Sequence, residues 1–195
     1  MTAELPQDFL RVIPDGLPVP EDDGACGHLT GSRLPSVPLR STADQWVDLS
    51  ALPGLTIIYC YPMTGRPGIP LPDGWVQTPG AAGCTPQSCS FRDRHRDLQA
   101  LGVRVFGLSA QSTADQHEAA ERLALPYELL SDAQLTFAAA IGLPTFEIAG
   151  LHLLKRVTLV VRDGQVIKYF YPVFPPDRNV EETIAWLQAA LDDRV

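Results

Sequence analysis

Short apolar runs, separated by polar and helical stretches, set the pattern of this chain. Residues 55–61 (LTIIYCY) combine β-branched and aromatic residues between a glycine and a proline, which is typical of a buried strand. Residues 103–109 (VRVFGLS) have the same character and predict a second strand. A hairpin is predicted at 156–173, because its two apolar runs flank Asp163 and Gly164, a pair that suits tight turns.

Helix signals lie between these strands. The polar stretch 85–101 predicts a helix with Thr85 as its N-cap and Pro86 at the first helical position. Residues 112–125 predict another helix, capped by the serine at its start or by the threonine after it.

Two further helical segments follow. Residues 127–143 predict a turn and a short helix, and residues 180–193 predict an amphipathic helix with Ile184, Leu187 and Leu191 on one stripe. The order of strand, helix, strand, helix, hairpin and helix indicates an α/β fold with a mixed β-sheet sandwiched by helices.

Two segments show neither helical nor strand periodicity. Residues 1–30 are rich in proline, glycine and acidic residues, and we expect an irregular N-terminal extension ahead of one domain at 31–195. Residues 63–83 form a loop rich in proline and glycine inside that domain. Loops of this length are usually functional or disordered.

Composition excludes several classes of function. The 195 residues fit one domain, and 23 acidic against 15 basic residues give a net charge of -8, which repels nucleic acid. No apolar run approaches the roughly 18 residues of a membrane span, so we expect no membrane partner. The N-terminus lacks the pattern of a secretory signal, which favours a cytoplasmic location where thiols stay reduced.

Two of the four cysteines, Cys84 and Cys89, lie in the segment 83–93 (GCTPQSCSFRD). This segment resembles the active-site stretch of peroxiredoxins of the bacterioferritin-comigratory (peroxiredoxin Q) type, in which Gly-Cys-Thr, a second cysteine five residues on and Phe-Arg-Asp recur. Residues 103–132 resemble the family's strand, helix and Leu-Ser-Asp segment, and residues 155–166 resemble its arginine-containing strand and turn. The chain is similar to the family over most of its length.

The resemblance implies a thioredoxin-like fold and a thiol peroxidase that reduces hydrogen peroxide and organic hydroperoxides. It implies that Cys84 is the peroxidatic cysteine, that Cys89 resolves it as an intrachain disulfide, and that thioredoxin or a similar dithiol protein is the reductant. No metal or cofactor is implied. Arg156 matches the family's active-site arginine, whose planar, charged donors suit an oxyanion.

The position of Cys84 supports this role. It stands at the start of a predicted helix, where unpaired N–H groups and the helix dipole favour a thiolate. Attack on peroxide leaves a sulfenic acid that must condense with a nearby thiol before further oxidation. In an intact helix, Cα atoms five residues apart are roughly 8 to 9 Å apart, whereas a disulfide needs less than about 7 Å. We therefore expect the first turn to unwind before Cys84 and Cys89 can bond.

One departure from the family pattern concerns the threonine beside the peroxidatic cysteine. The family places it three residues before that cysteine, where this chain has Ala81. Thr64 and Thr78 are the two candidates to supply the hydroxyl. Thr78 keeps the family's Thr-Pro-Gly order, whereas Thr64 follows the strand end closely; we favour Thr64 slightly.

The remaining candidates have plainer interpretations. Cys60 lies within a predicted strand and is expected to be a small buried hydrophobe. Cys26 lies in the irregular extension and is expected to be an exposed thiol whose acidic neighbours raise its pKa. His117 is expected on a helix surface. Trp75 is expected to pack in the core or under a loop, and covering the peroxide pocket is its alternative role. The cysteine and histidine spacing does not suit a zinc site.

Two other functions could use the same cysteines. A thioredoxin-like thiol-disulfide oxidoreductase is disfavoured because the chain has no C-x-x-C motif. A redox-sensing binding protein on the same fold would use the cysteine pair to switch a partner surface. The sequence allows either a monomer or a homodimer.

Overall fold

The computed structural model describes residues 12–192 and contains a seven-stranded mixed β-sheet with the strand order β2-β1-β5-β4-β3-β8-β9. The strands of this sheet are β1 (Pro38–Ser41), β2 (Trp46–Asp48), β3 (Leu55–Cys60), β4 (Val103–Ser109), β5 (Glu128–Ser131), β8 (Val157–Arg162) and β9 (Gln165–Phe170). Strands β3, β4 and β5 run parallel, and β8, β9, β1 and β2 pair antiparallel. A separate hairpin joins β6 (Thr145–Ile148) to β7 (Leu151–Leu154).

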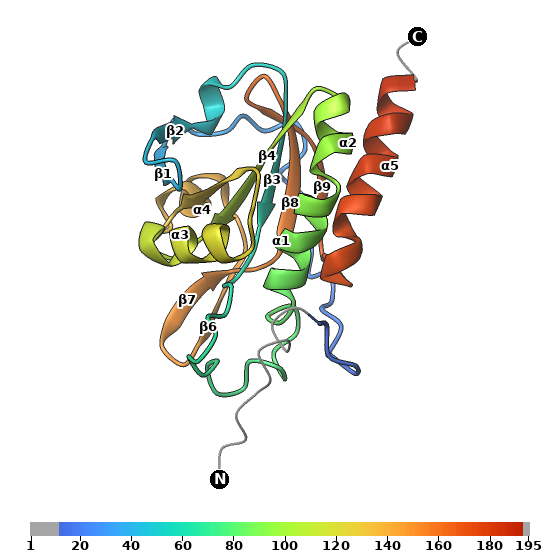
Figure 1. Ribbon diagram of the computed structural model, residues 1–195. Coiled ribbons are helices and arrows are strands. Elements are labelled where there is room, and N and C mark those ends of the chain that lie inside the picture. The colour runs from blue at the N-terminus through green and yellow to red at the C-terminus, as the bar shows by residue number, and fades with distance from the viewer. Residues whose placement is uncertain (1–11, 193–195) are drawn as a thin grey trace.

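Helices cover both faces of the sheet, as Figure 1 shows. Helices α1 (Cys84–Asp93), α2 (His95–Ala100) and α5 (Asn179–Asp192) lie together on one face. Helix α4 (Thr136–Ile141) packs on the other face, and α3 (Thr113–Arg122) lies beside β5. Residues 12–192 also contain two short 3-10 turns, η2 (Leu49–Ala51) and η3 (Pro176–Arg178). The predicted mixed sheet sandwiched by helices is confirmed.

The position of strand β3 explains why its residues are mostly apolar and do not alternate with polar ones. Ile57 and Tyr59 face the cluster under α1 and α5, whereas Ile58 and Cys60 face the cluster under α4. Successive strand residues point to opposite faces, so a central strand covered on both sides must be apolar throughout. Cys60 has no exposed surface, as expected of a small buried hydrophobe.

The predicted helix at 85–101 was wrong in three respects. It is divided at Arg94 into α1 and α2, Thr85 is not its N-cap, and Pro86 is its third residue rather than its first. Gly83 takes the cap position with a left-handed φ of 97°, so Cys84 is itself the first helical residue. The earlier start follows from backbone geometry, because glycine adopts a positive φ without steric cost.

The remaining elements agree with the sequence predictions in some places and differ in others. Ser112 caps α3 by accepting a hydrogen bond from the N–H of Asp115, as expected. Asp163 and Gly164 form the predicted hairpin turn, with φ angles of 49° and 74°. The short strands β1, β2, β5, β6 and β7 were missed, because runs of three or four residues carry too little alternation to recognise.

The described part of the N-terminal segment has no helix or strand before β1, apart from one isolated bridge at Arg33, yet it contributes to the core. Cys26 and Leu29 are buried in the same cluster as Cys60, with 1% and 0% exposure. The expectation that Cys26 is exposed was therefore wrong: irregular backbone can still bury its side chains. Burial, and secondarily Asp23, raises the pKa of the Cys26 thiol to about 12. The predicted upward direction was right, although burial is the larger cause.

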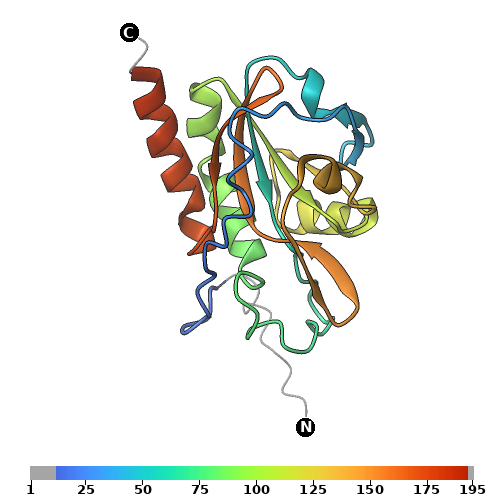
Figure 2. The same cartoon turned by 180° about the vertical axis from the view of Figure 1, so that it is seen from behind.

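Asp23 fastens this segment to the sheet. Its carboxylate accepts a hydrogen bond from Lys155 Nζ at 2.7 Å and another from the Tyr171 hydroxyl at 2.8 Å. These bonds lower the pKa of Asp23 to about 2, and the bond from Lys155 has the largest effect. In Figure 2 the segment can be followed from the start of α1 up the rear of the sheet.

Replacing Asp23 with asparagine is expected to lower the melting temperature at neutral pH. Because the folded-state pKa is depressed from 3.8 to about 2, the stabilisation is complete above about pH 4 and is lost as pH falls toward 2. Melting curves of the native protein and Asp23→Asn should thus converge over that range. Asp22→Asn is the matched control, because the asparagine oxygen can still accept from the N–H of Gly24. A constant difference down to pH 2 would contradict this assignment.

Candidate active site

Cys84 lies where the loop after β3 enters α1, and its side chain is 3% exposed. Gly83 must precede it, since its φ is left-handed and an added Cβ would collide with the ring of Pro176. The thiol is thus placed at the N-terminal end of a ten-residue helix, where backbone N–H groups lack intrahelical partners. That location stabilises negative charge on sulfur.

Arg156, just before β8, faces the sulfur. Its Nη2 atom lies 3.2 Å from Cys84 Sγ, and the arginine is only 3% exposed. The same nitrogen donates to the carbonyl oxygens of Gly80, Ala81 and Ala82 at 3.1 to 3.3 Å. The Cys84 thiol in turn contacts the carbonyl of Ala81 at 3.4 Å. A buried guanidinium surrounded by neutral carbonyls favours an anion at the sulfur.

A polar chain behind Arg156 fixes its orientation. Arg156 Nη1 donates to Gln87 Oε1, and Gln87 Nε2 donates to Asn179 Oδ1 at 3.1 Å. The Thr158 hydroxyl donates to the same Asn179 oxygen at 2.6 Å. Asn179 opens α5 and is 1% exposed, so the chain links α1, β8 and α5 in the interior. Sequence reasoning missed Gln87 and Asn179, because no motif marks them.

A second buried network holds the middle of α1. The Tyr127 hydroxyl donates to the Ser88 carbonyl at 2.8 Å, and it lies 3.0 Å from the Tyr59 hydroxyl. The hydroxyls of Tyr59 and Ser88 are 3.1 Å apart. Burial raises the pKa of both tyrosines, so both hydroxyls stay protonated. Tyr59 also stacks on Phe91 with ring centroids 4.6 Å apart.

The two candidate threonines have hydrogen-bond partners away from Cys84. The hydroxyl of Thr64 bonds to Gln111 Oε1 at 3.1 Å, which ties the start of the loop to the end of β4. The Thr78 hydroxyl donates to the carbonyl of Gly74 at 2.9 Å and closes a turn within the loop. The structure therefore brings Cys84 and Arg156 together, but it brings neither threonine to hydrogen-bonding contact with the sulfur.

A small cavity opens above Cys84. Its volume is about 30 Å³, and the loop at 63–83 supplies most of its wall. Trp75 lines it and is 4% exposed, which agrees with the alternative role of covering the pocket. The apolar lining residues are Val12, Pro14, Met63, Leu71, Trp75 and Ala82.

Cys89 lies five residues beyond Cys84 in the same continuous helix, and it is partly exposed. The two residues are thiols rather than a disulfide in this structure. While α1 is intact, the five-residue spacing keeps the Cα atoms of Cys84 and Cys89 too far apart for a disulfide.

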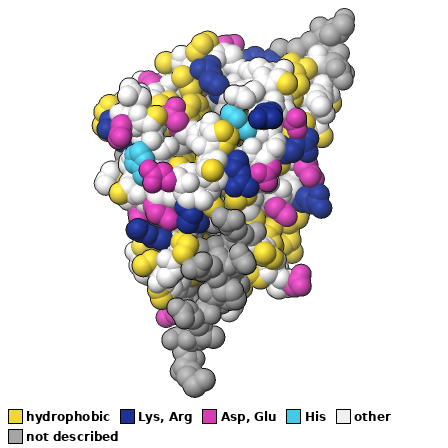
Figure 3. All heavy atoms as spheres, viewed as in Figure 1, with side chains coloured by type: hydrophobic (Ala, Val, Ile, Leu, Met, Phe, Trp, Pro, Cys, Tyr) yellow, Lys and Arg dark blue, Asp and Glu magenta, His cyan; other side chains and the backbone are white. Residues whose placement is uncertain are grey.

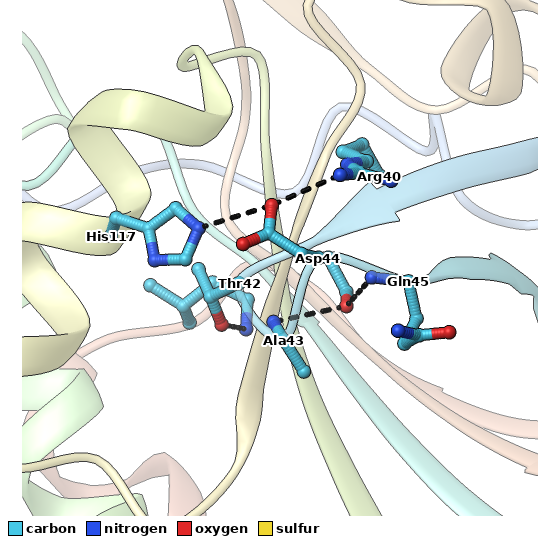
Figure 4. A network of polar contacts seen from close by, with 8 residues as sticks. Arg40, Thr42, Ala43, Asp44, Gln45 and His117 are labelled. Atoms are coloured by element: carbon cyan, nitrogen blue, oxygen red, sulfur yellow. Dashed lines mark hydrogen bonds and ion pairs between the residues drawn. The ribbon is translucent and has the colours of Figure 1, made fainter.

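A different polar network lies away from this site, at the turn between β1 and β2. Asp44 accepts from Arg40 Nη2 at 3.0 Å and lies 3.7 Å from Nε2 of His117 on α3, as Figure 4 shows. These groups are partly or largely exposed, which agrees with the surface position expected for His117. Exposed pairs of this kind contribute little to stability.

Comparison with known proteins places the chain among relatives of the same architecture. A family model described as Redoxin matches residues 29–184. A putative chloroplastic peroxiredoxin Q from Oryza sativa subsp. indica is 30% identical over 167 residues, covering 84% of this chain and 69% of that protein. Chloroplastic peroxiredoxin Q from Gentiana triflora is 27% identical over 188 residues, covering 93% and 79%. The crystal structure of peroxidoxin BcpB from Mycobacterium tuberculosis aligns with a TM-score of 0.66 at 27% identity, covering 83% of this chain and 98% of that one.

Fold and site together define a thioredoxin-like thiol peroxidase. The chain belongs to the redoxin family, and within it to the peroxiredoxins of the Q, or bacterioferritin-comigratory, type. The resemblance seen in the sequence is confirmed, and the peroxidase interpretation is supported over the thiol-disulfide oxidoreductase.

Removing the Tyr127 hydroxyl is expected to loosen α1. In Tyr127→Phe the Ser88 carbonyl and the Tyr59 hydroxyl each lose a buried partner, so the free energy of unfolding should fall by about 1 to 2 kcal/mol. Urea denaturation measures the change. Tyr169→Phe is the control, because that ring packs partly buried on the other face of the sheet. Equal stability of Tyr127→Phe and the native protein would show that this network does not stabilise α1.

Proposed function

We propose that Cys84 is the peroxidatic cysteine. The observation that carries this assignment is the pairing of a nearly buried sulfur with the guanidinium of Arg156 at 3.2 Å, at a helix N-terminus. The thiolate attacks one oxygen of the peroxide and the O–O bond breaks. The attacked oxygen stays on sulfur with its hydrogen, and the other leaves as hydroxide or alkoxide, which takes a proton from solvent to become water or alcohol. Cys84 is thereby oxidised to a sulfenic acid.

Arg156 serves this step through charge and geometry. Its guanidinium faces the sulfur and is placed to stabilise the negative charge that moves onto the departing oxygen. Gln87 and Asn179 keep it aimed at the sulfur, so little reorganisation is needed during reaction.

Thr64 and Thr78 remain the candidates to supply a hydroxyl in a rearranged loop. Thr78 lines a gap together with Arg156. Thr64 would first have to leave Gln111.

Cys89 completes the cycle. Its thiol attacks the sulfenic sulfur of Cys84, a disulfide forms and water leaves. Thioredoxin or a similar dithiol protein then reduces the disulfide. The first turns of α1 unwind for the two sulfurs to meet, which requires the Tyr59–Tyr127–Ser88 contacts to open.

The partners and the cellular location of this enzyme are proposed from its charge, its helices and its relatives. A net charge of -8 disfavours nucleic acid, and on the face in Figure 3 acidic and basic side chains are interspersed. No helix within residues 12–192 is long and apolar enough to cross a membrane, and the same residues include no group of three potential metal ligands. A cytoplasmic location remains a prediction, since the two plant relatives named above are chloroplastic. The monomer and the homodimer both stay open.

Two serine variants test the roles of the cysteines. We expect Cys84→Ser to abolish oxidation by peroxide, because the nucleophile is gone. Cys89→Ser should react once with peroxide and then fail to be recycled by thioredoxin. Peroxide-dependent consumption of reduced thioredoxin and single-turnover oxidation measure the two steps. If Cys84→Ser reacts with peroxide at the native rate, Cys84 is not the peroxidatic cysteine. If Cys89→Ser turns over normally, a thiol other than Cys89 resolves the sulfenic acid, as in a redox sensor with an external partner.

Amide hydrogen exchange tests the unwinding of α1. Protection of the amides of residues 87–93 should be high in the reduced protein and lost in the disulfide form, since these amides bond within α1 and the disulfide cannot form across an intact helix. The amides of β3 are the internal control, because they lie in the sheet centre and should be protected in both states. Equal protection of 87–93 in both redox states would rule out a disulfide that requires unwinding.

A further inference from the structure

The N-terminal residues 12–20 cross the mouth of the active site, although their sequence shows no motif. We call this segment the strap. Val12 and Pro14 line the cavity above Cys84. Leu17 and Pro18 line a second gap that borders Arg156 and has about 0 Å³ of free space. Pro20 lies against Gly80, one of the loop residues whose carbonyls Arg156 binds. The strap thus contacts the surroundings of both partners of the reactive pair.

The strap is held at its C-terminal end. Asp23 follows it by three residues and is bonded to Lys155, the immediate neighbour of Arg156. Beyond Asp23, the buried Cys26 fixes the chain in the core. Three prolines within the strap restrict its backbone further.

The space that the strap leaves is small and apolar. A volume of about 30 Å³ accommodates only one or two molecules of the size of water. Hydrogen peroxide fits this space, whereas a hydroperoxide that carries a phenyl ring does not. The strap is held less firmly than the core: Val12 and Val19 are 62% and 63% exposed, and none of its residues is fully buried.

We infer that the strap sets the size of peroxide that Cys84 admits, so that the protein favours hydrogen peroxide over hydroperoxides with bulky apolar groups. This inference rests on the proposed role of Cys84. Bulky hydroperoxides reach the sulfur only when the strap is displaced, and the strap is therefore a determinant of specificity.

The test uses full-length proteins that also carry Cys89→Ser, so that reaction stops at the sulfenic acid. One protein keeps the native strap, and one carries Val12→Ala, Pro14→Ala and Leu17→Ala. The matched control is Val19→Ala, which trims an exposed side chain that lines neither gap. Rate constants for oxidation of Cys84 are measured with hydrogen peroxide and with cumene hydroperoxide.

The ratio of the cumene hydroperoxide rate to the hydrogen peroxide rate should rise roughly tenfold in the triple variant, the scale on which small changes in pocket size discriminate substrates. Val19→Ala should keep the native ratio. An unchanged ratio in the triple variant overturns the inference. A lower ratio also overturns it, because the strap would then be a binding wall for the bulky group.

A second measurement separates this inference from the assignment of Cys84. The same proteins are alkylated with iodoacetamide and with a bulky fluorescein maleimide, and labelling of Cys84 is followed by mass spectrometry. The triple variant should gain labelling by the bulky reagent selectively. If no variant reacts with any peroxide, the peroxidase role fails while this labelling still decides whether the strap limits access. Equal bulky labelling of native and triple-variant straps overturns the inference.

Discussion

The contact between the buried guanidinium of Arg156 and the sulfur of Cys84 is the interaction on which the rest of the site depends. A cation removed from water needs partners of opposite or partial negative charge, and it finds three loop carbonyls, Gln87 and the sulfur. The loop at 63–83 thus folds back over the arginine, and α1 is oriented with its first turn toward β8. A neutral residue at position 156 would remove the reason for this arrangement as well as the charge.

Helix α1 has two opposing requirements. Its wound form holds Cys84 against Arg156, whereas the proposed disulfide with Cys89 requires it to unwind. The tyrosine network binds its middle, at Ser88, through a side chain from β3 and another from just before β5. The wound state therefore draws stability from the sheet at its middle, and its first turns are held by Arg156 and by Asn179 through Gln87. In the proposed cycle, these contacts set how readily the helix opens after oxidation.

The central strands and the candidate cysteine pair could be recognised in the sequence because their signals are local. The apolar runs of β3 and β4, the Asp-Gly turn and the spacing of Cys84 and Cys89 are each contained in a few adjacent residues. Arg156 was found through resemblance to a family. The short strands, the buried Cys26 and the chain from Gln87 to Asn179 depend on contacts between segments far apart in sequence, which leave no periodicity. The threonine candidates failed to contact Cys84 because the inserted loop satisfies their hydroxyls within itself and at Gln111.

The burial of Cys26 and Cys60 has a consequence for the chemistry of the whole molecule. Burial raises the pKa of both thiols, and both lie in the core on the face of the sheet away from α1. Because the thiolate is the form that peroxide oxidises, these two sulfurs are withheld from the oxidant that the protein encounters in every cycle. Half of the four cysteines are therefore unreactive toward peroxide in the folded protein. A count of reactive thiols in the native protein therefore reports on the integrity of the fold as well as on its redox state.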